Sequence, residues 1–191
     1  MINAPQASVI AHTRAWVEQA VIGLELCPFA KTPHARRQIR FQVSEAVDAD
    51  SLLQDLCNEL HLLAAADPAA VETTVLIHPR AMADFLDYNY FLEAADGAVR
   101  ALGYEGVLQV ASFHPRYQFA GTEPDDVTNA SNRSPYPTLH LLREASVERA
   151  VQALGDTEAI FRRNLRTLED LGPAGWGRLQ ATILDADKAG G

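Results

Sequence analysis

The chain has 191 residues, of which 48% are hydrophobic and 21% charged, so it suits one folded domain and is not a disordered protein. Its formal net charge of −9 argues against nucleic acid as a partner, because proteins that bind nucleic acid neutralise phosphates with clustered Lys and Arg. No apolar run approaches the roughly 20 residues that span a membrane, and two cysteines are too few for a disulfide framework, so we expect a cytoplasmic protein without a membrane partner.

The first half of the chain predicts helices that alternate with strands. Residues 7–25 carry apolar side chains at helical spacing and predict a helix that ends near Cys27, because the proline after it disfavours helical geometry. Alternating apolar and polar residues predict a strand at 38–46. A helix with one apolar face follows Asp50, and a β-branched run predicts a buried strand at 73–79.

The second half of the chain predicts two more strands and several helices. Residues 81–102 carry apolar side chains at helical spacing, and Gly103 stands where a left-handed residue ends a helix. Strands are predicted at 106–115 and 137–144. Ser146 can cap the short helix that follows the last strand.

This order of elements predicts a single α/β (or α+β) domain over residues 1–191. A sheet of about four strands, parallel or mixed, should be covered by about six helices, since strands that alternate with helices of this length form such sheets. A polar loop at 120–137 interrupts the pattern, and a frayed tail of about residues 186–191 ends it.

Two similar segments, at 75–80 and 111–116, end an apolar strand with His-Pro-Arg. In open α/β sheets, ligands bind beyond the carboxyl ends of the strands. His78 and His114 could therefore share a site there, as general acid and base or as metal ligands. In the alternative, each histidine caps its strand by bonding nearby backbone, and for His78 alone this alternative is favoured.

The loop at 120–137 is a connection of 18 residues that almost lacks apolar side chains. Connections of this length in compact domains are lids, binding loops or disordered segments. Its mixture of side chains and its prolines favour a binding loop over a flexible linker. The candidate residues in this loop are Asp125, Asp126, Asn129, Asn132, Arg133 and Tyr136.

The charged residues of the loop permit more than one interpretation. Paired carboxylates can ligate a cation or act as general acid and base, although the adjacent Asp125 and Asp126 need not face one site. Arg133 could hold an anionic group of a substrate in a bidentate pair, or it could neutralise the two aspartates as a structural clamp.

Cys27 is predicted at the end of the first helix, where no helix dipole lowers the pKa of a thiol. A Cys–His pair with His78 or His114 is possible, because such partners are near in space and distant in sequence. Packing of the thiol in the core is the favoured alternative. His140 follows the loop within a predicted strand and faces either the same site or the core.

Several familiar site motifs are missing from the sequence. It contains no phosphate-binding Gly-rich loop, no Gly-x-Ser-x-Gly elbow, no Cys-x-x-Cys pair and no His-Glu-x-x-His. Nucleoside triphosphates, serine hydrolase chemistry of that type and structural zinc are therefore disfavoured. The sequence assigns no cofactor, no metal ligands and no oligomeric state.

Residues 26–30 (LCPFA), 112–115 (SFHP) and 125–144 (DDVTNASNRSPYPTLHLLRE) carry a resemblance to a known family. Over nearly its full length the chain resembles a bacterial family catalogued as domain of unknown function 1415. The resemblance implies a stand-alone bacterial protein of one domain and brings no activity, substrate or cofactor with it. The residues that match motif positions of the family are Cys27, His78, His114, Asp125, Asp126, Asn129, Asn132, Arg133 and Tyr136.

The leading hypothesis is an enzyme that acts on a small polar or anionic molecule by acid–base or metal-assisted chemistry. His114 would be the general acid or base, Asp125 or Asp126 would orient it or bind a cation, and Arg133 would hold the substrate. In the alternative, a binding module uses residues 112–137 to hold a small ligand or a protein partner without chemistry. A third interpretation makes the loop structural, with its polar groups bonded to one another. The residues that would supply oriented hydrogen bonds to a ligand are Asn129, Asn132 and Tyr136.

Overall fold

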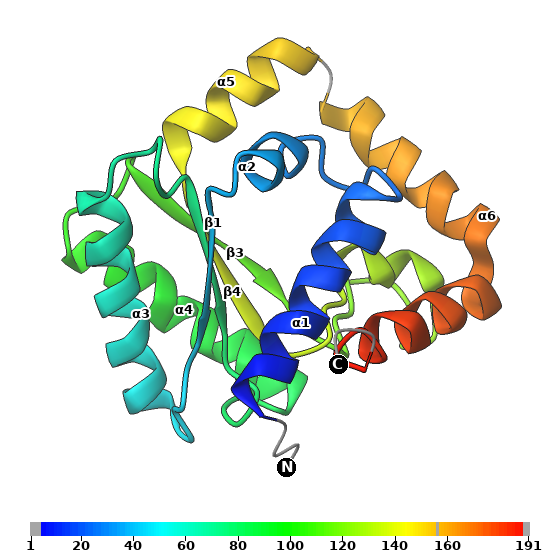
Figure 1. The fold of residues 1–191 in the computed structure, drawn as a ribbon, viewed down its shortest axis with the longest axis horizontal. Helices are drawn as coiled ribbons and strands as arrows, with labels where there is room; N and C mark the ends of the chain where they lie inside the picture. The colour runs from blue at the N-terminus through cyan, green and yellow to red at the C-terminus, as the bar shows by residue number, and fades with distance from the viewer. Residues whose placement is uncertain (1–4, 156, 189–191) are drawn as a thin grey trace.

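A four-stranded mixed sheet forms the centre of the protein, in a computed structural model that describes residues 5–155 and 157–188 (Figure 1). Its strands are β1 (Ile39–Val43), β2 (Thr73–Ile77), β3 (Leu108–Phe113) and β4 (Thr138–Arg143). They lie in the order β1-β2-β4-β3, with β1 parallel to β2 and β4 antiparallel to both β2 and β3. This arrangement confirms the predicted α/β class with a mixed sheet.

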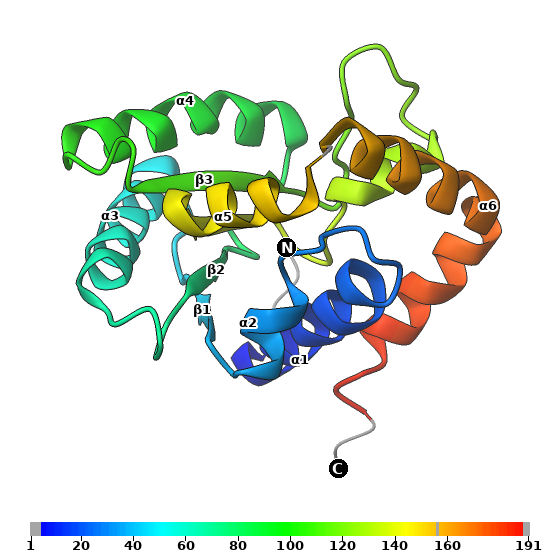
Figure 2. The same ribbon diagram turned by 90° about the horizontal axis from the view of Figure 1, so that it is seen from above.

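Helices cover both faces of the sheet (Figure 2). They are α1 (Gln6–Trp16), its π-helical continuation η1 (Val17–Ile22), α2 (Lys31–Ala35), α3 (Ala49–Ala65), α4 (Phe85–Ala101), the 3₁₀ segment η2 (Val127–Asn132), α5 (Glu144–Leu154) and α6 (Thr157–Leu184). α3 and α4 lie on one face, whereas α1, α2 and α5 lie on the other (Figures 1 and 2).

The face under α3 and α4 holds the main hydrophobic core. Because α3 places an apolar side chain on every third or fourth position, one side of it is fully buried against the sheet. Tyr88 of α4 is fully buried in the same core. The fully buried leucines that line up here are Leu52, Leu56, Leu60 and Leu63 of α3 with Leu76 of β2 and Leu139 and Leu141 of β4.

Aspartates fix the starts of the two core helices. Asp48 Oδ1 accepts a hydrogen bond from Ser51 N at 2.8 Å, so α3 begins directly after Asp48. Asp84 Oδ1 accepts from Leu86 N at 2.9 Å, so α4 begins later than the apolar pattern alone predicts. Gly103, with a φ of 74°, follows α4 in the left-handed conformation that the sequence predicts.

The other face of the sheet is covered less completely. No described residue of α5 is buried, although the helix lies over this face. The prediction that Ser146 caps α5 is wrong, because the helix begins at Glu144 and Ser146 Oγ instead accepts from Arg149 Nη2 at 2.8 Å. The incomplete cover leaves apolar side chains of the sheet open to a cavity.

The C-terminal helix and the residues after it pack on the first helix and on the polar loop. α6 changes direction at Gly172, whose φ is 66°, and its described residues lie against α1 and η2. Of the predicted tail, residues 186–188 are described, and there Asp187 Oδ1 lies 3.1 Å from His12 Nε2; residues 189–191 lie outside the described residues. In the part of the chain that the structure describes, the helices are too short or too polar to cross a bilayer.

Candidate functional site

The two histidines that follow apolar strands lie at one edge of the sheet. β1, β2 and β3 point in the same direction, because β4 is antiparallel to β2 and β3. The carboxyl ends of β2 and β3 therefore share an edge, where His78 and His114 follow. Both imidazole rings pack on Tyr88 of α4, with ring centroids 5.7 Å and 5.2 Å from the centroid of the tyrosine ring.

Backbone groups occupy both ring nitrogens of His114. Nδ1 accepts from Arg116 N at 3.0 Å, so Nε2 carries the proton and donates to Met82 O at 3.2 Å. Burial lowers the pKa of His114, which keeps the ring neutral. The bond also holds Met82 in a left-handed conformation, with a φ of 54°. His114 thus braces the turn before α4, and its role as general acid or base stays a prediction.

His78 bonds the turn that follows its own strand. Its side chain is fully buried, and Nδ1 donates to Ala81 O at 3.1 Å. Nε2 is then the unprotonated nitrogen, and it has no hydrogen-bond partner among the described residues. Burial lowers the pKa of His78 to about 4. This arrangement agrees with the strand-capping alternative.

Asn129 organises the polar loop from its centre. The residue is fully buried, and its Oδ1 accepts from Phe119 N at 2.9 Å and from Thr122 Oγ1 at 2.8 Å. Its Nδ2 donates to Glu123 O at 2.9 Å. All three partners belong to the loop or to the residues leading into it, so the amide closes the loop on itself.

The charged residues of the loop bond its backbone. Asp126 Oδ1 accepts from Thr128 N at 2.8 Å and from Thr128 Oγ1 at 2.7 Å, and these bonds lower the pKa of Asp126. Arg133 donates from Nε to Tyr117 O at 3.1 Å and from Nη2 to Pro124 O at 2.6 Å. Arg133 therefore ties Tyr117, which precedes the loop, to Pro124 within it, and no described carboxylate forms an ion pair with it.

The remaining candidates of the loop point to different places. Asn132 Nδ2 donates to Ser112 O at 3.1 Å and ties the loop to β3. Tyr136 is buried, and its Oη lies 2.8 Å from Nδ1 of His12 in α1. Asp125 is exposed. The loop reaches His114 through its backbone, since His114 N donates to Asn132 O at 3.1 Å, but none of the candidate side chains of the loop bonds the His114 ring. These contacts favour the structural interpretation of the loop, while the catalytic or binding roles of its residues stay predictions.

Cys27 lies in a different place from the one expected. The first helix ends at Ile22, and Cys27 precedes the turn that leads into α2, where Ala30 N donates to Cys27 O at 3.3 Å. Burial raises the pKa of the Cys27 thiol, and the backbone N–H groups of Phe29 and Ala30 lower it by less. Cys27 is a free thiol that lies in the wall of a cavity.

The cavity has a volume of about 740 Å³ and lies between the second face of the sheet and the segments α1, η1, α2 and α5. Most of its lining surface is apolar. The wall includes Trp16 and Val17 from the first helix, Phe29 from the turn, Ala111 and Phe113 from β3 and Val147 from α5. Cys27 is the one predicted catalytic residue in this wall.

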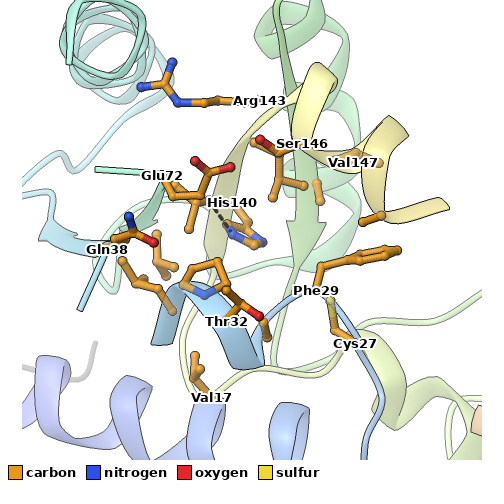
Figure 3. Close-up of a pocket in the computed structure, with 18 of the residues that line it drawn as sticks. Val17, Cys27, Phe29, Thr32, Gln38, Glu72, His140, Arg143, Ser146 and Val147 are labelled. Carbon is orange, nitrogen blue, oxygen red and sulfur yellow. Dashed lines mark hydrogen bonds between the residues drawn. The ribbon is translucent and has the colours of Figure 1, made fainter. Parts of the chain in front are cut away.

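His140 of β4 forms the centre of the cavity floor (Figure 3). Its Nε2 lies 2.8 Å from Thr73 Oγ1, and Thr73 Oγ1 itself donates to Leu141 O at 2.5 Å. Burial lowers the pKa of His140 to about 4, so the ring is neutral at physiological pH. Figure 3 shows Cys27 and Phe29 on one side of the cavity and the guanidinium of Arg143 turned away from it.

The charge around the cavity is opposite to the charge of the whole chain. Its charged lining residues are three arginines, Arg36, Arg143 and Arg149, and one carboxylate, Glu72, whereas the chain has 16 basic and 25 acidic residues. Arg143 is committed to three backbone carbonyls at and beyond the end of α3. Arg36 and Arg149 are exposed, and neither has a described ion pair. The cavity can therefore accept an anionic group.

A smaller cavity of about 290 Å³ adjoins the large one. The two share Val21, Cys27 and Phe113 as wall residues. Asn164 of α6 also lines the smaller cavity, and its Oδ1 is buried without a partner among the described residues. Within residues 5–155 and 157–188, no three His, Cys, Asp or Glu side chains are grouped so that they could hold a metal ion.

Sequence reasoning missed most of the cavity. It named Cys27 and left His140 open between a site and the core, but it assigned no role to Thr73, Gln109 or Arg149. The one available signal was that Thr138, His140 and Leu142 alternate along a strand, so they share one face of the sheet and place the imidazole of His140 on that face.

Comparisons with known proteins give a family and no activity. A family model described as "Protein of unknown function (DUF1415)" matches residues 8–178. No curated protein and no solved structure matches the chain.

Proposed function

Since the chain belongs to the DUF1415 family, whose description carries no function, we propose from the cavity that this protein binds a small amphipathic anion, with the apolar body inside and the anionic end at the mouth. The observation that carries the proposal is a large apolar cavity whose charged rim is basic in an acidic protein. The bacterial origin and the cytoplasmic location are parts of the same proposal, and two free thiols fit a reducing compartment.

The size and lining of the cavity match those of ligand sites. Small-molecule pockets have volumes of roughly 300–1,000 Å³, with mostly apolar walls and a few polar groups that orient the ligand. The cavity of about 740 Å³ is open to solvent, so water fills it when no ligand is bound. Apolar walls favour replacement of that water by the apolar body of a ligand.

The rim determines the polarity of the ligand. Arg36 in the turn after α2 and Arg149 on α5 are exposed residues of the lining, and only Glu72 opposes them in charge. An arginine binds a carboxylate, sulfonate or phosphate through paired N–H groups. An anion at the mouth would leave the ligand's apolar body against Trp16 and Phe113.

The ionisation states inside the cavity favour binding over catalysis. The raised pKa of Cys27 keeps the thiol protonated, and the lowered pKa of His140 keeps the imidazole neutral. A cysteine nucleophile acts as a thiolate, usually beside a protonated histidine. Cys27 is a thiol and His140 is neutral, so neither residue is in the form that this chemistry requires. An enzyme acting on the same anion is the alternative, and it would require turnover that depends on Cys27.

Trp16 provides the measurement, because it lies in the cavity wall with its ring 5.2 Å from that of Phe113. The chain has one other tryptophan, so Trp176→Phe leaves Trp16 as the reporter. Titration with decanoate should shift its emission saturably. Decylammonium, with the same chain and the opposite charge, should bind about tenfold more weakly or worse.

A filled cavity supplies the control. Ala111 lies opposite His140 in the sheet, so Ala111→Phe places a ring inside the cavity and should abolish binding. Ala94→Phe adds the same ring on the exposed side of α4 and should leave binding unchanged. Binding of decanoate that survives Ala111→Phe in a folded protein, or no binding to the unmodified chain, would refute the proposal.

A further inference from the structure

We propose that His140 selects the ligand: its Nδ1 accepts a hydrogen bond from an O–H or N–H group on the ligand's apolar body. The ligand class is then an amphipathic anion that carries a hydroxyl or amine donor part of the way along it. This inference rests on the proposed function, because it concerns the same cavity.

The hydrogen bonds around Thr73 fix which nitrogen of His140 is free. Thr73 Oγ1 has a single proton, and it donates that proton to Leu141 O at 2.5 Å. The contact of 2.8 Å between Thr73 Oγ1 and His140 Nε2 therefore has the imidazole as donor. A neutral imidazole carries one N–H, so Nδ1 holds a lone pair and can only accept.

The half-buried position of the ring in the cavity floor favours this neutral form. Burial lowers the pKa of His140 to about 4, with no neighbouring charge among the causes. An imidazole that is neutral at all physiological pH values presents the same acceptor under all of them.

The neighbours of His140 leave room for a ligand above the ring. In the sheet it is paired with Val75 on one side and Ala111 on the other, and the small side chain of Ala111 leaves space in the cavity beside the imidazole ring. The ring of Phe113 is tilted, with its centroid 6.2 Å away. No described residue, Cys27 included, donates to Nδ1.

An acceptor in this position discriminates between ligands. Filling an apolar cavity with a body that lacks a donor removes water from Nδ1 and leaves the lone pair unpaired, which is costly. A body with a hydroxyl at that depth restores the bond. Sites built in this way reject analogues that lack the matching polar group.

The test uses two probes with the same substitution pattern, hydroxynaphthoate and methoxynaphthoate, which differ in that a methyl group replaces the hydroxyl hydrogen. Both are aromatic anions that suit the proposed cavity, and only the first has an O–H donor. Isothermal titration calorimetry should show that the unmodified protein prefers the hydroxyl probe by about tenfold.

Three variants of His140 separate the acceptor from the packing. His140→Phe removes both nitrogens, and His140→Gln keeps a donor for Thr73 while removing the acceptor at the δ position; both should bring the preference to about one. His140→Asn places an amide oxygen where Nδ1 stood and should retain the preference. Should a variant not fold, nitrogen NMR of the unmodified protein still reports whether Nδ1 is unprotonated and whether its signal moves only with the hydroxyl probe.

The outcomes distinguish this inference from the proposed function. Equal binding of both probes to the unmodified protein, or a preference that persists in folded His140→Phe, overturns the role of His140 and leaves the cavity as a binding site. If neither probe binds, the proposed function is overturned as well. A protonated Nδ1 in the free protein overturns the tautomer on which the inference stands.

Discussion

Acidification from pH 7 to pH 5 should destabilise this protein strongly, because the fold holds two histidines in the neutral form: His78 is fully buried, and His140 is half-buried in the cavity wall. Burial lowers the pKa of both His78 and His140 to about 4. In the unfolded chain a histidine has a pKa of about 6.5. Protons therefore bind the unfolded state first, so the stabilisation is complete above about pH 6.5 and is lost as the pH falls towards 4.

The magnitude follows from these two pKa values. A shift from about 6.5 to about 4 costs about 2 kcal/mol per histidine between pH 7 and pH 5, so the two together cost about 4 kcal/mol. The lowered pKa of His114 adds a loss of the same sign. Typical domains have a total stability of about 5–15 kcal/mol, so this loss is a large fraction of it. Asp126, whose pKa is lowered by its bonds to Thr128, remains ionised over this range and does not oppose the effect.

Urea unfolding at pH 7, 6 and 5 measures the effect, with the free energy of unfolding extrapolated to water at each pH. His140→Gln and His78→Gln should each reduce the loss between pH 7 and pH 5 by about 2 kcal/mol, whatever their effect at pH 7. Their effects on the loss should add, because no charge interaction couples His78 to His140. A total loss of less than about 1 kcal/mol in the unmodified protein, or a full loss in both variants, would show that these rings are not buried in the neutral form.

Three further predictions concern the scaffold and the thiol. Tyr88→Phe removes one hydroxyl that donates to a backbone carbonyl and accepts from a backbone N–H, at 2.8 Å and 3.1 Å, so it should cost about 3 kcal/mol in urea unfolding at pH 7. Asn129→Ala removes the three hydrogen bonds of a buried side chain, so it should lower the free energy of unfolding by about 3 kcal/mol and make the loop susceptible to limited proteolysis. Asp125→Ala, at an exposed position of the same loop, should change neither the stability nor the proteolysis by a measurable amount. In a Cys57→Ala background, Cys27 should react with iodoacetamide at neutral pH more slowly than a free thiol, because its pKa is raised, and decanoate should slow it further; a faster reaction would contradict the buried, protonated thiol.

The strands and long helices could be predicted from the sequence, because their pattern of apolar residues reports local geometry directly. The β-branched run at 73–77 and the periodic apolar face at 49–65 are examples. The place of β4 could not be predicted, because hydrogen bonding between strands leaves no mark on local patterns. Its insertion between β2 and β3 is what sets His140 beside Ala111.

The hydrogen-bond partners of the candidate residues could not be predicted, and the reason is physical. Backbone atoms accept or donate most of the bonds made by His114, Asn129 and Arg133. Every residue carries such backbone groups, so the sequence does not show where a polar side chain will find its partner. A polar side chain that the sequence suggests for catalysis can therefore be bonded to the backbone in the folded protein.

The polar loop and the cavity are connected through β4. An irregular segment of 18 residues has few ladder partners for its backbone, so side chains such as Asn129, Asp126 and Arg133 must supply them. Once closed, the loop leads straight into β4, whose alternate side chains form the cavity floor. The polar loop would then affect ligand binding indirectly, by fixing the strand that carries His140. Substitutions that loosen the loop should weaken ligand binding, although none of those three side chains lines the cavity.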